Sequence, residues 1–100
     1  MNDKLLSFLG IARRAGRLSL GCDAATEAMQ GGKSKLLLLA SDLSERTARN
    51  MKHTAEQTRT QTIVLDRTME QLGGSVGKMT GIISVNDEGF AKKLVTLCTE

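Results

Sequence analysis

The residues best suited to chemistry fall in three stretches of the sequence. Arg13, Arg14 and Arg17 form a group of cations shortly before Gly21-Cys22-Asp23, which the pattern places at the start of a helix. The start of a helix presents unpaired backbone N–H groups and partial positive charge, which suit a phosphate group or an electron-rich base edge. The third stretch, residues 76–80, combines glycine and lysine with apolar residues. These stretches favour binding of a polyanion, and the alternative is that their charges are solvated and have no ligand.

The candidate binding residues come from these stretches and from two lysines beyond the far end of the same helix. We expect one constellation, because a strand over residues 17–20 would leave the arginines just before it and the helix start just after it. The candidates are Arg13, Arg14, Arg17, Gly21, Cys22, Asp23, Lys33, Lys35, Val76, Gly77, Lys78 and Met79.

Two further patterns do not support nucleotide binding or catalysis. The segment GGSVGK at residues 73–78 resembles a P-loop, but Leu72 stands where that motif needs glycine and Met79 where it needs a hydroxyl residue. The single histidine, His53, has no acid or nucleophile at helical spacing that would make it a base. We therefore expect no nucleotide cofactor and no catalytic residue.

The cysteines do not form a metal or redox motif. Cys22 and Cys98 lie near opposite ends of the chain, and with one histidine they are too few for a four-ligand zinc site. We expect two buried, reduced thiols rather than a disulfide. The one argument for an enzyme is that Cys22 would begin a helix, where the thiolate is favoured; we expect a protein that is not an enzyme.

Composition limits the kinds of protein that this chain can be. Its 100 residues suffice for one domain, residues 1–100, and the 40% hydrophobic fraction is that of a globular chain. Phe8 and Phe90 are its only aromatic residues, which excludes single-strand binding on a platform of stacked rings. Residues 1–60 hold ten Lys and Arg against six acids, whereas residues 61–100 hold four against five. The basic bias is weak support for a polyanionic partner.

Helical and strand patterns alternate along the chain. No apolar run approaches the roughly 20 residues that span a bilayer, so we predict no membrane segment. We expect a cytoplasmic monomer. The leucine-rich segment 35–40 reads as a central strand buried on both faces. Alternation of this kind predicts an α/β fold, a three-layer α/β/α sandwich with a mixed sheet of about four strands. The expected helices are 4–15, 22–30, 44–58, a short helix from Thr68 that ends at Gly73-Gly74, and 87–97, and the expected strands are 17–20, 35–40, 61–65 and 80–85. Asp3 is the expected N-cap of the first helix, and Thr68 and Gln71 fit a capping box at the start of the short one.

Several segments in order carry a resemblance to a known family. They are LGIARRAGRLSLG near the N-terminus, GGKSKLLLLASDLSERT in the middle, TIVLDRTMEQLGGSVGK, and the closing VNDEGFAKKL. Over residues 5–97 the chain resembles the bacterial YlxQ-type branch of the ribosomal protein L-seven-A-e superfamily. The resemblance implies a single α/β/α domain that binds RNA, typically kink-turns in ribosomal or other RNA, and that associates with the ribosome.

The resemblance also implies where RNA would bind and how this chain differs from the family. The family reads guanine edges through a Gly-x-Asn-Glu-x-x-Lys pattern at the start of the second helix, and it packs the loop at residues 76–81 against an extruded nucleotide. Gly21 matches this pattern, whereas Asp23, Ala24 and Glu27 replace the asparagine, glutamate and lysine. Two outcomes are open: Asp23 accepts hydrogen bonds from guanine while nearby cations contact phosphates, or the chain binds another RNA shape or binds RNA chiefly through the ribosome. The alternative is a protein-interaction module on the same fold that binds RNA weakly.

Overall fold

Helices and strands alternate along the part of the chain that the computed structural model describes, residues 3–99. The expected order of nine elements is confirmed, with ends that shift by one or two residues at most positions. The helices are α1 (Lys4–Arg14), α2 (Cys22–Gln30), α3 (Glu45–Gln57), α4 (Met69–Val76) and α5 (Glu88–Thr99). The strands are β1 (Leu18–Leu20), β2 (Leu36–Leu39), β3 (Thr62–Val64) and β4 (Ile82–Val85).

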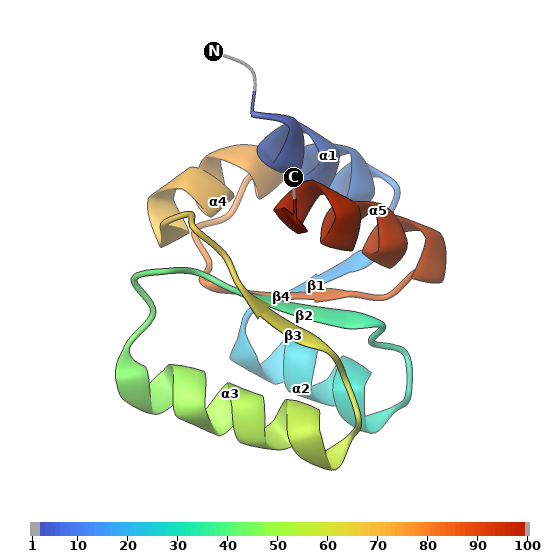
Figure 1. The fold of residues 1–100 in the computed structure, drawn as a ribbon, viewed down its shortest axis with the longest axis vertical. Coiled ribbons are helices and arrows are strands. Elements are labelled where there is room, and N and C mark those ends of the chain that lie inside the picture. Colours follow the sequence, from blue (N-terminus) through green and yellow to red (C-terminus); the bar gives the residue numbers. More distant parts are fainter. Residues whose placement is uncertain (1–2, 100) are drawn as a thin grey trace.

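The four strands form one mixed sheet in the order β1-β4-β2-β3. β4 is antiparallel to both of its neighbours, whereas β2 and β3 are parallel. The carboxyl ends of β1, β2 and β3 therefore share one edge of the sheet with the start of β4; we call this the carboxyl edge, formed by residues 21–23, 40–44, 65–68 and 77–81. The opposite amino edge is formed by residues 15–17, 31–35, 58–61 and 86–87 (Figure 1).

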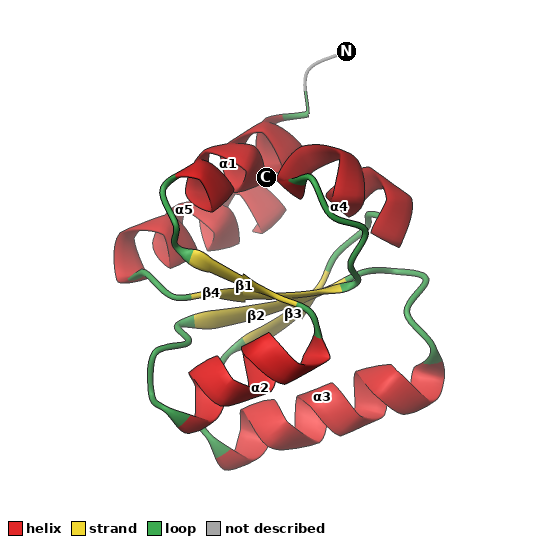
Figure 2. Ribbon diagram, turned by 180° about the vertical axis from the view of Figure 1, so that it is seen from behind, coloured by secondary structure: helices red, strands yellow, loops and turns green. Residues whose placement is uncertain are grey.

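Helices cover both faces of the sheet and complete the predicted three-layer α/β/α sandwich. α1, α4 and α5 lie on one face, and α2 and α3 lie on the other (Figure 2). The four leucines of β2 are fully buried, and they alternate between the two hydrophobic clusters. Leu36 and Leu38 pack in the cluster with α1 and α5, while Leu37 and Leu39 pack with α2 and α3. The prediction of a central strand buried on both faces is confirmed.

The end of α4 differs from the prediction. The sequence places it at Gly73-Gly74, but the helix continues through both glycines to Val76 and ends at Gly77, whose φ of 81° is left-handed. Gly73 serves close packing rather than termination, because a Cβ atom there would lie 2.9 Å from the Cα atom of Met79. The capping box at the other end is confirmed: the Gln71 N–H donates to the Thr68 hydroxyl, and the Thr68 N–H donates to the Gln71 side chain.

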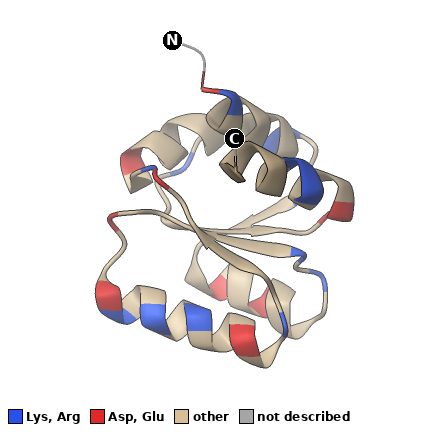
Figure 3. Ribbon diagram, in the orientation of Figure 1, with Lys and Arg blue, Asp and Glu red and all other residues tan. Residues whose placement is uncertain are grey.

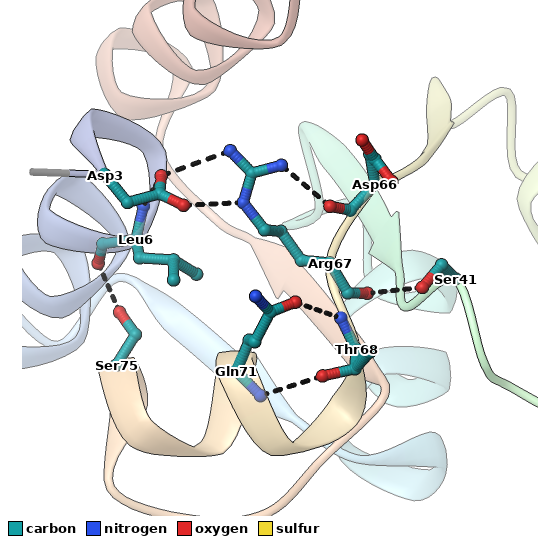
Figure 4. A network of polar contacts seen from close by, with 8 residues as sticks. All are labelled: Asp3, Leu6, Ser41, Asp66, Arg67, Thr68, Gln71 and Ser75. Carbon is teal, nitrogen blue, oxygen red and sulfur yellow. Dashed lines mark hydrogen bonds and ion pairs between the residues drawn. The ribbon is translucent and has the colours of Figure 1, made fainter. Parts of the chain in front are cut away.

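One polar corner ties the start of α1 to the loop before α4 (Figure 4). Asp3 accepts a hydrogen bond from the Leu6 N–H, as its predicted N-cap role requires, and pairs with Arg67 across a 2.7 Å contact between Oδ2 and Nε. The hydroxyl and N–H of Ser41 both donate to the Arg67 carbonyl. The Ser75 hydroxyl donates to the Leu6 carbonyl. The corner thus joins α1, α4 and the loops after β2 and β3.

The cysteines contradict the prediction that both thiols are buried. Both are free, but Cys22 is exposed and Cys98 is half-buried. The inward positions of α2 are taken by Ala25, Ala28 and Met29, which leaves Cys22 at the outer side of the first turn. Burial raises the pKa of the Cys98 thiol.

Alanine substitutions at the two glycines inside α4 should have opposite effects on the free energy of unfolding. We predict that Gly74→Ala raises the free energy of unfolding by about 0.5–1 kcal/mol, because alanine favours a helix and nothing lies within 4 Å of the new Cβ. Gly73→Ala should lower it by about 1–3 kcal/mol, because its Cβ overlaps the backbone of the loop before β4. Urea unfolding of both variants measures the difference, and equal effects would contradict the close packing.

The Asp3–Arg67 pair predicts a stability that falls in acid. Its hydrogen bond with Arg67 holds the pKa of Asp3 below the ordinary value. Because the pKa of Asp3 is lowered in the folded state, the ion pair contributes fully to the free energy of unfolding above the unfolded-state pKa of about 3.9. This contribution disappears as the pH falls through the folded-state pKa. Asp3→Asn keeps an N-cap side chain but loses the charge, so we expect it to cost up to about 1 kcal/mol at pH 7. Urea unfolding should show this gap narrowing as the pH falls below about 3.9; a constant gap would contradict the ionic contribution.

Candidate functional site

The carboxyl edge brings the start of α2 against the loop before β4. The Gly21 N–H donates to the Ile82 carbonyl at 2.9 Å, so the last residue before α2 is bonded to the first residue of β4. The Thr80 hydroxyl donates to the same carbonyl and accepts from the Ile82 N–H, which fixes the end of the loop. Two of the three stretches that the sequence singles out are therefore neighbours.

The start of α2 leaves backbone donors available. Gly21 has φ 93° and ψ 167°, a conformation that side chains other than glycine rarely adopt, and α2 receives no hydrogen bond from a side chain at its N-cap. The other four helices of residues 3–99 each have such a bond, from Asp3, Ser44, Thr68 and Asp87. Cys22 and Asp23 are exposed in the first turn of α2. The N–H groups of this turn can meet an electron-rich group of a ligand.

The loop before β4 supplies a cation and an exposed apolar side chain. Lys78 is exposed, and Met79 is 68% exposed, more than any other large hydrophobic residue of residues 3–99. The left-handed Gly77 turns the chain out of α4 into this loop. Val76 does not line the surface as the sequence predicts, because it is only 4% exposed and packs in the core.

A third segment lines the same edge and was missed by the sequence prediction. The loop between β2 and α3 packs so closely on Gly81 that a Cβ there would lie 2.7 Å from Cδ1 of Leu43. The start of α2 also rests on the middle of α3, since Cys22 Sγ lies 3.7 Å from Met51 Sδ. The available signal was the position of residues 40–44 directly after a central strand, because ligands of open α/β sheets bind beyond the carboxyl ends of strands.

Most of the predicted cations lie elsewhere, so the expectation of one constellation is wrong. The Arg17 carbonyl accepts from the Asn86 N–H, and the Lys35 N–H donates to the Val85 carbonyl, which places both at the amino edge. Lys33 lies in the loop before β2 at that edge. The three residues of β1 lie between Arg17 and Gly21, so four extended steps separate these two residues by roughly 13 Å. The prediction was wrong because residues that are close in sequence, on either side of β1, lie at opposite edges of the sheet.

The two other arginines belong to the end of α1. Arg13 is exposed in its last turn. Arg14 folds back along the helix, so that its Nη1 lies 3.9 Å from where a Cβ of Gly10 would be. It lines a groove between α1 and α4 with Ile11 and Ser75. Neither arginine forms a hydrogen bond or an ion pair with the start of α2 within residues 3–99.

The carboxyl edge is rich in acids, as helix starts commonly are. Asp42 accepts from the Met69 N–H at 2.9 Å and so satisfies the start of α4. Arg67, in the loop before α4, forms an ion pair with Asp3. Lys78, in the loop before β4, forms no ion pair within residues 3–99. Figure 3 shows acidic positions at the starts of α3 and α4. The acids of this edge and of the first turns of α3 and α4 that follow it are Asp23, Asp42, Glu45, Asp66 and Glu70.

Within residues 3–99 there is no group of three side chains that could hold a metal ion, and no helix long and apolar enough to cross a membrane. His53 is exposed on α3. The arrangement at the carboxyl edge offers hydrogen-bond donors, a carboxylate, an ammonium group and a thioether. These groups can bind a ligand with polar edges, anionic groups and an apolar face.

Comparison with known proteins identifies the family. Residues 3–95 match the model of the Ribosomal protein L7Ae/L30e/S12e/Gadd45 family. The chain belongs to this family. The resemblance stated from the sequence is thereby confirmed, and the match covers the start of α2, the loop before β4 and both edges of the sheet.

Two curated relatives place the chain within the L7Ae family. It is 31% identical over 91 residues to the RNA-binding protein YlxQ of Bacillus subtilis, covering 90% of each chain. It is 25% identical over 91 residues to the large ribosomal subunit protein eL30 of Saccharomyces cerevisiae, covering 89% of this chain and 87% of the relative.

Solved structures share the fold. A protein of unknown function from Bacillus halodurans matches with a TM-score of 0.92 at 32% identity, covering 99% of this chain and 100% of that one. The Giardia lamblia 15.5kD RNA binding protein matches with a TM-score of 0.78 at 14% identity, covering 99% of this chain and 88% of that one. The second likeness concerns the fold alone, and it confirms the α/β/α architecture.

Proposed function

We propose that this chain is a non-catalytic, ribosome-associated RNA-binding protein that recognises structured, kink-turn-like RNA at the carboxyl edge. The observation that supports this is the contact between the uncapped start of α2 and the exposed loop before β4, in a chain whose relatives are named RNA-binding and ribosomal proteins. We call Gly21, Cys22, Asp23 and the loop residues 77–79 the reading site.

The groups of the reading site suit a guanine edge beside a phosphate backbone. The Asp23 carboxylate can accept from guanine N1–H and N2–H, and the free N–H groups of α2 can donate to O6 or to a phosphate oxygen. Lys78 contributes a positive charge next to the backbone. Met79 offers an exposed apolar contact for an unstacked base. In this arrangement base contacts specify the RNA, and the lysine positions it.

The kink-turn preference depends mainly on Asp23. Sheared G·A pairs expose guanine edges that the start of a helix can reach, and each bidentate base contact discriminates by about 1–3 kcal/mol. Ala24 and Glu27 are exposed on α2 but cannot donate to a guanine, and Glu27 repels phosphate. The reading site therefore has fewer base contacts than the family pattern, and its charge limits affinity.

We predict that Asp23→Asn increases the preference for a kink-turn RNA over a copy whose G·A pairs are replaced by Watson–Crick pairs. The amide adds a donor for O6 and removes a negative charge, so the affinity ratio should rise at least about fivefold, or about 1 kcal/mol. Lys78→Ala is the matched control: it should weaken both RNAs alike and reduce the salt slope by about one unit. Gel shifts over a salt series measure both quantities.

Equal affinity of the native chain for the two RNAs would refute kink-turn recognition. An unchanged ratio in Asp23→Asn would show that this carboxylate does not meet a base edge. Partners that remain bound in a pull-down after nuclease treatment would instead support a protein-interaction module, for which the acids of the carboxyl edge would be the docking surface.

A further inference from the structure

We propose that the amino edge is a second RNA-binding surface, which holds phosphate backbone without reading bases. Its residues are Arg17, Lys33, Lys35 and Arg59, here named the basic edge. They lie in the loops that precede β1, β2 and β3, at the end of the sheet opposite the reading site. Figure 3 shows basic positions in the loops before β2 and β3. The proposal rests on the proposed function in that RNA is taken as the polyanion.

The backbone fixes the spacing of these cations. Arg17 and Lys35 flank the same strand end, because the Arg17 carbonyl accepts from Asn86 and the Lys35 N–H donates to the Val85 carbonyl. They begin strands two positions apart in the sheet, a separation of roughly 10 Å. That distance corresponds to about three phosphates along one strand of a duplex. One stretch of backbone can therefore lie across the edge and meet several cations.

The cations of the basic edge are available to a ligand. All four are exposed, and none takes part in an ion pair within residues 3–99. Two carboxylates of the adjoining helix are already engaged: Asp87 accepts from the Phe90 N–H at 2.9 Å, and Glu88 pairs with Lys92 at 3.8 Å. A hollow of about 310 Å³ between Lys35, Gln61 and Lys92 adds a recess at the same edge.

Two other carboxylates approach the basic edge without neutralising it. Glu27 lines a hollow beside β1 together with Lys33, but the two form no ion pair. Glu56 is exposed in the last turn of α3, before Arg59. The amino edge thus keeps an excess of positive charge where the carboxyl edge has an excess of acids, and a polyanion is the complementary partner.

Arg59 shows that a cation occupies a position where the backbone favours glycine. Its φ is 57°, and it is the only residue other than glycine with a positive φ in residues 3–99. The residues just after the caps of α1 and α2 are Gly16 and Gly32, both left-handed, as helix ends usually require. After the cap of α3 the same conformation is held by arginine at a cost in strain. A charged side chain at this strained position supports a role outside the fold.

If the basic edge holds the phosphate backbone, binding of duplex RNA without a kink-turn should depend on these particular cations and not on net charge alone. The variant Arg17→Gln/Lys33→Gln/Lys35→Gln should bind a duplex RNA without a kink-turn at least about tenfold more weakly, with a salt slope lower by about two to three units. The control Arg46→Gln/Arg49→Gln/Lys52→Gln removes the same charge from the exposed side of α3 and should change the slope by less than one unit. Gel shifts of both variants over a salt series test the proposal.

If both triple variants lose the same affinity for duplex RNA, net charge explains the binding and the basic edge is refuted. The proposal is also refuted if neither variant loses affinity. The ratio of kink-turn to G·A-replaced RNA is read in the same gels and should not change in the amino-edge variant. A native ratio of one together with a selective loss of duplex binding would refute the reading site while supporting the basic edge.

Arg59→Gly separates a binding role from a structural one. Glycine relieves the left-handed strain, so we expect the Tm to rise by about 4 °C while the affinity for the duplex RNA falls severalfold. A more stable protein that binds less RNA supports the basic edge. If the Tm falls, or if the affinity is unchanged, Arg59 serves the fold and its part in the proposal is refuted. Thermal unfolding and gel shifts on the same sample provide both values.

Discussion

The antiparallel insertion of β4 between β1 and β2 is the constraint on which the rest of the structure depends. Because β4 runs against its neighbours, the loop that precedes it arrives at the edge where β1, β2 and β3 end. The starts of α2, α3 and α4 follow those strands at the same edge. A β4 that ran in the other direction would place Lys78 and Met79 at the far end of the sheet, away from Gly21.

Close backbone packing then holds the loop in place. Gly73 admits the backbone of Met79, Gly81 admits Leu43, and the hydroxyl of Thr80 binds both polar groups of Ile82. These contacts leave little freedom between α4 and β4, and the exposed side chains of Lys78 and Met79 therefore project from a fixed support. A rigid support of this kind lowers the entropic cost of binding a large, shaped ligand.

The two edges of the sheet differ in charge for a reason that begins with the helices. Helix starts favour acids and helix ends favour cations, because the peptide dipoles align along each axis. With α2, α3 and α4 all starting at the carboxyl edge, and α1, α2 and α3 ending at the amino edge, these local preferences add up across the molecule. The proposed reading site consequently offers hydrogen-bonding groups and one lysine, whereas cations predominate at the proposed basic edge.

The sequence by itself determined what depends on neighbours a few positions away. The caps at Asp3 and Thr68, the order of the elements and the doubly buried β2 follow from local hydrogen bonds and from the pattern of apolar residues. Tertiary structure decided the end of α4, the exposure of Cys22 and the separation of Arg17 from Gly21. These features depend on strand order and on packing between segments distant in sequence, such as Gly73 against Met79, and neither composition nor helical spacing contains that information.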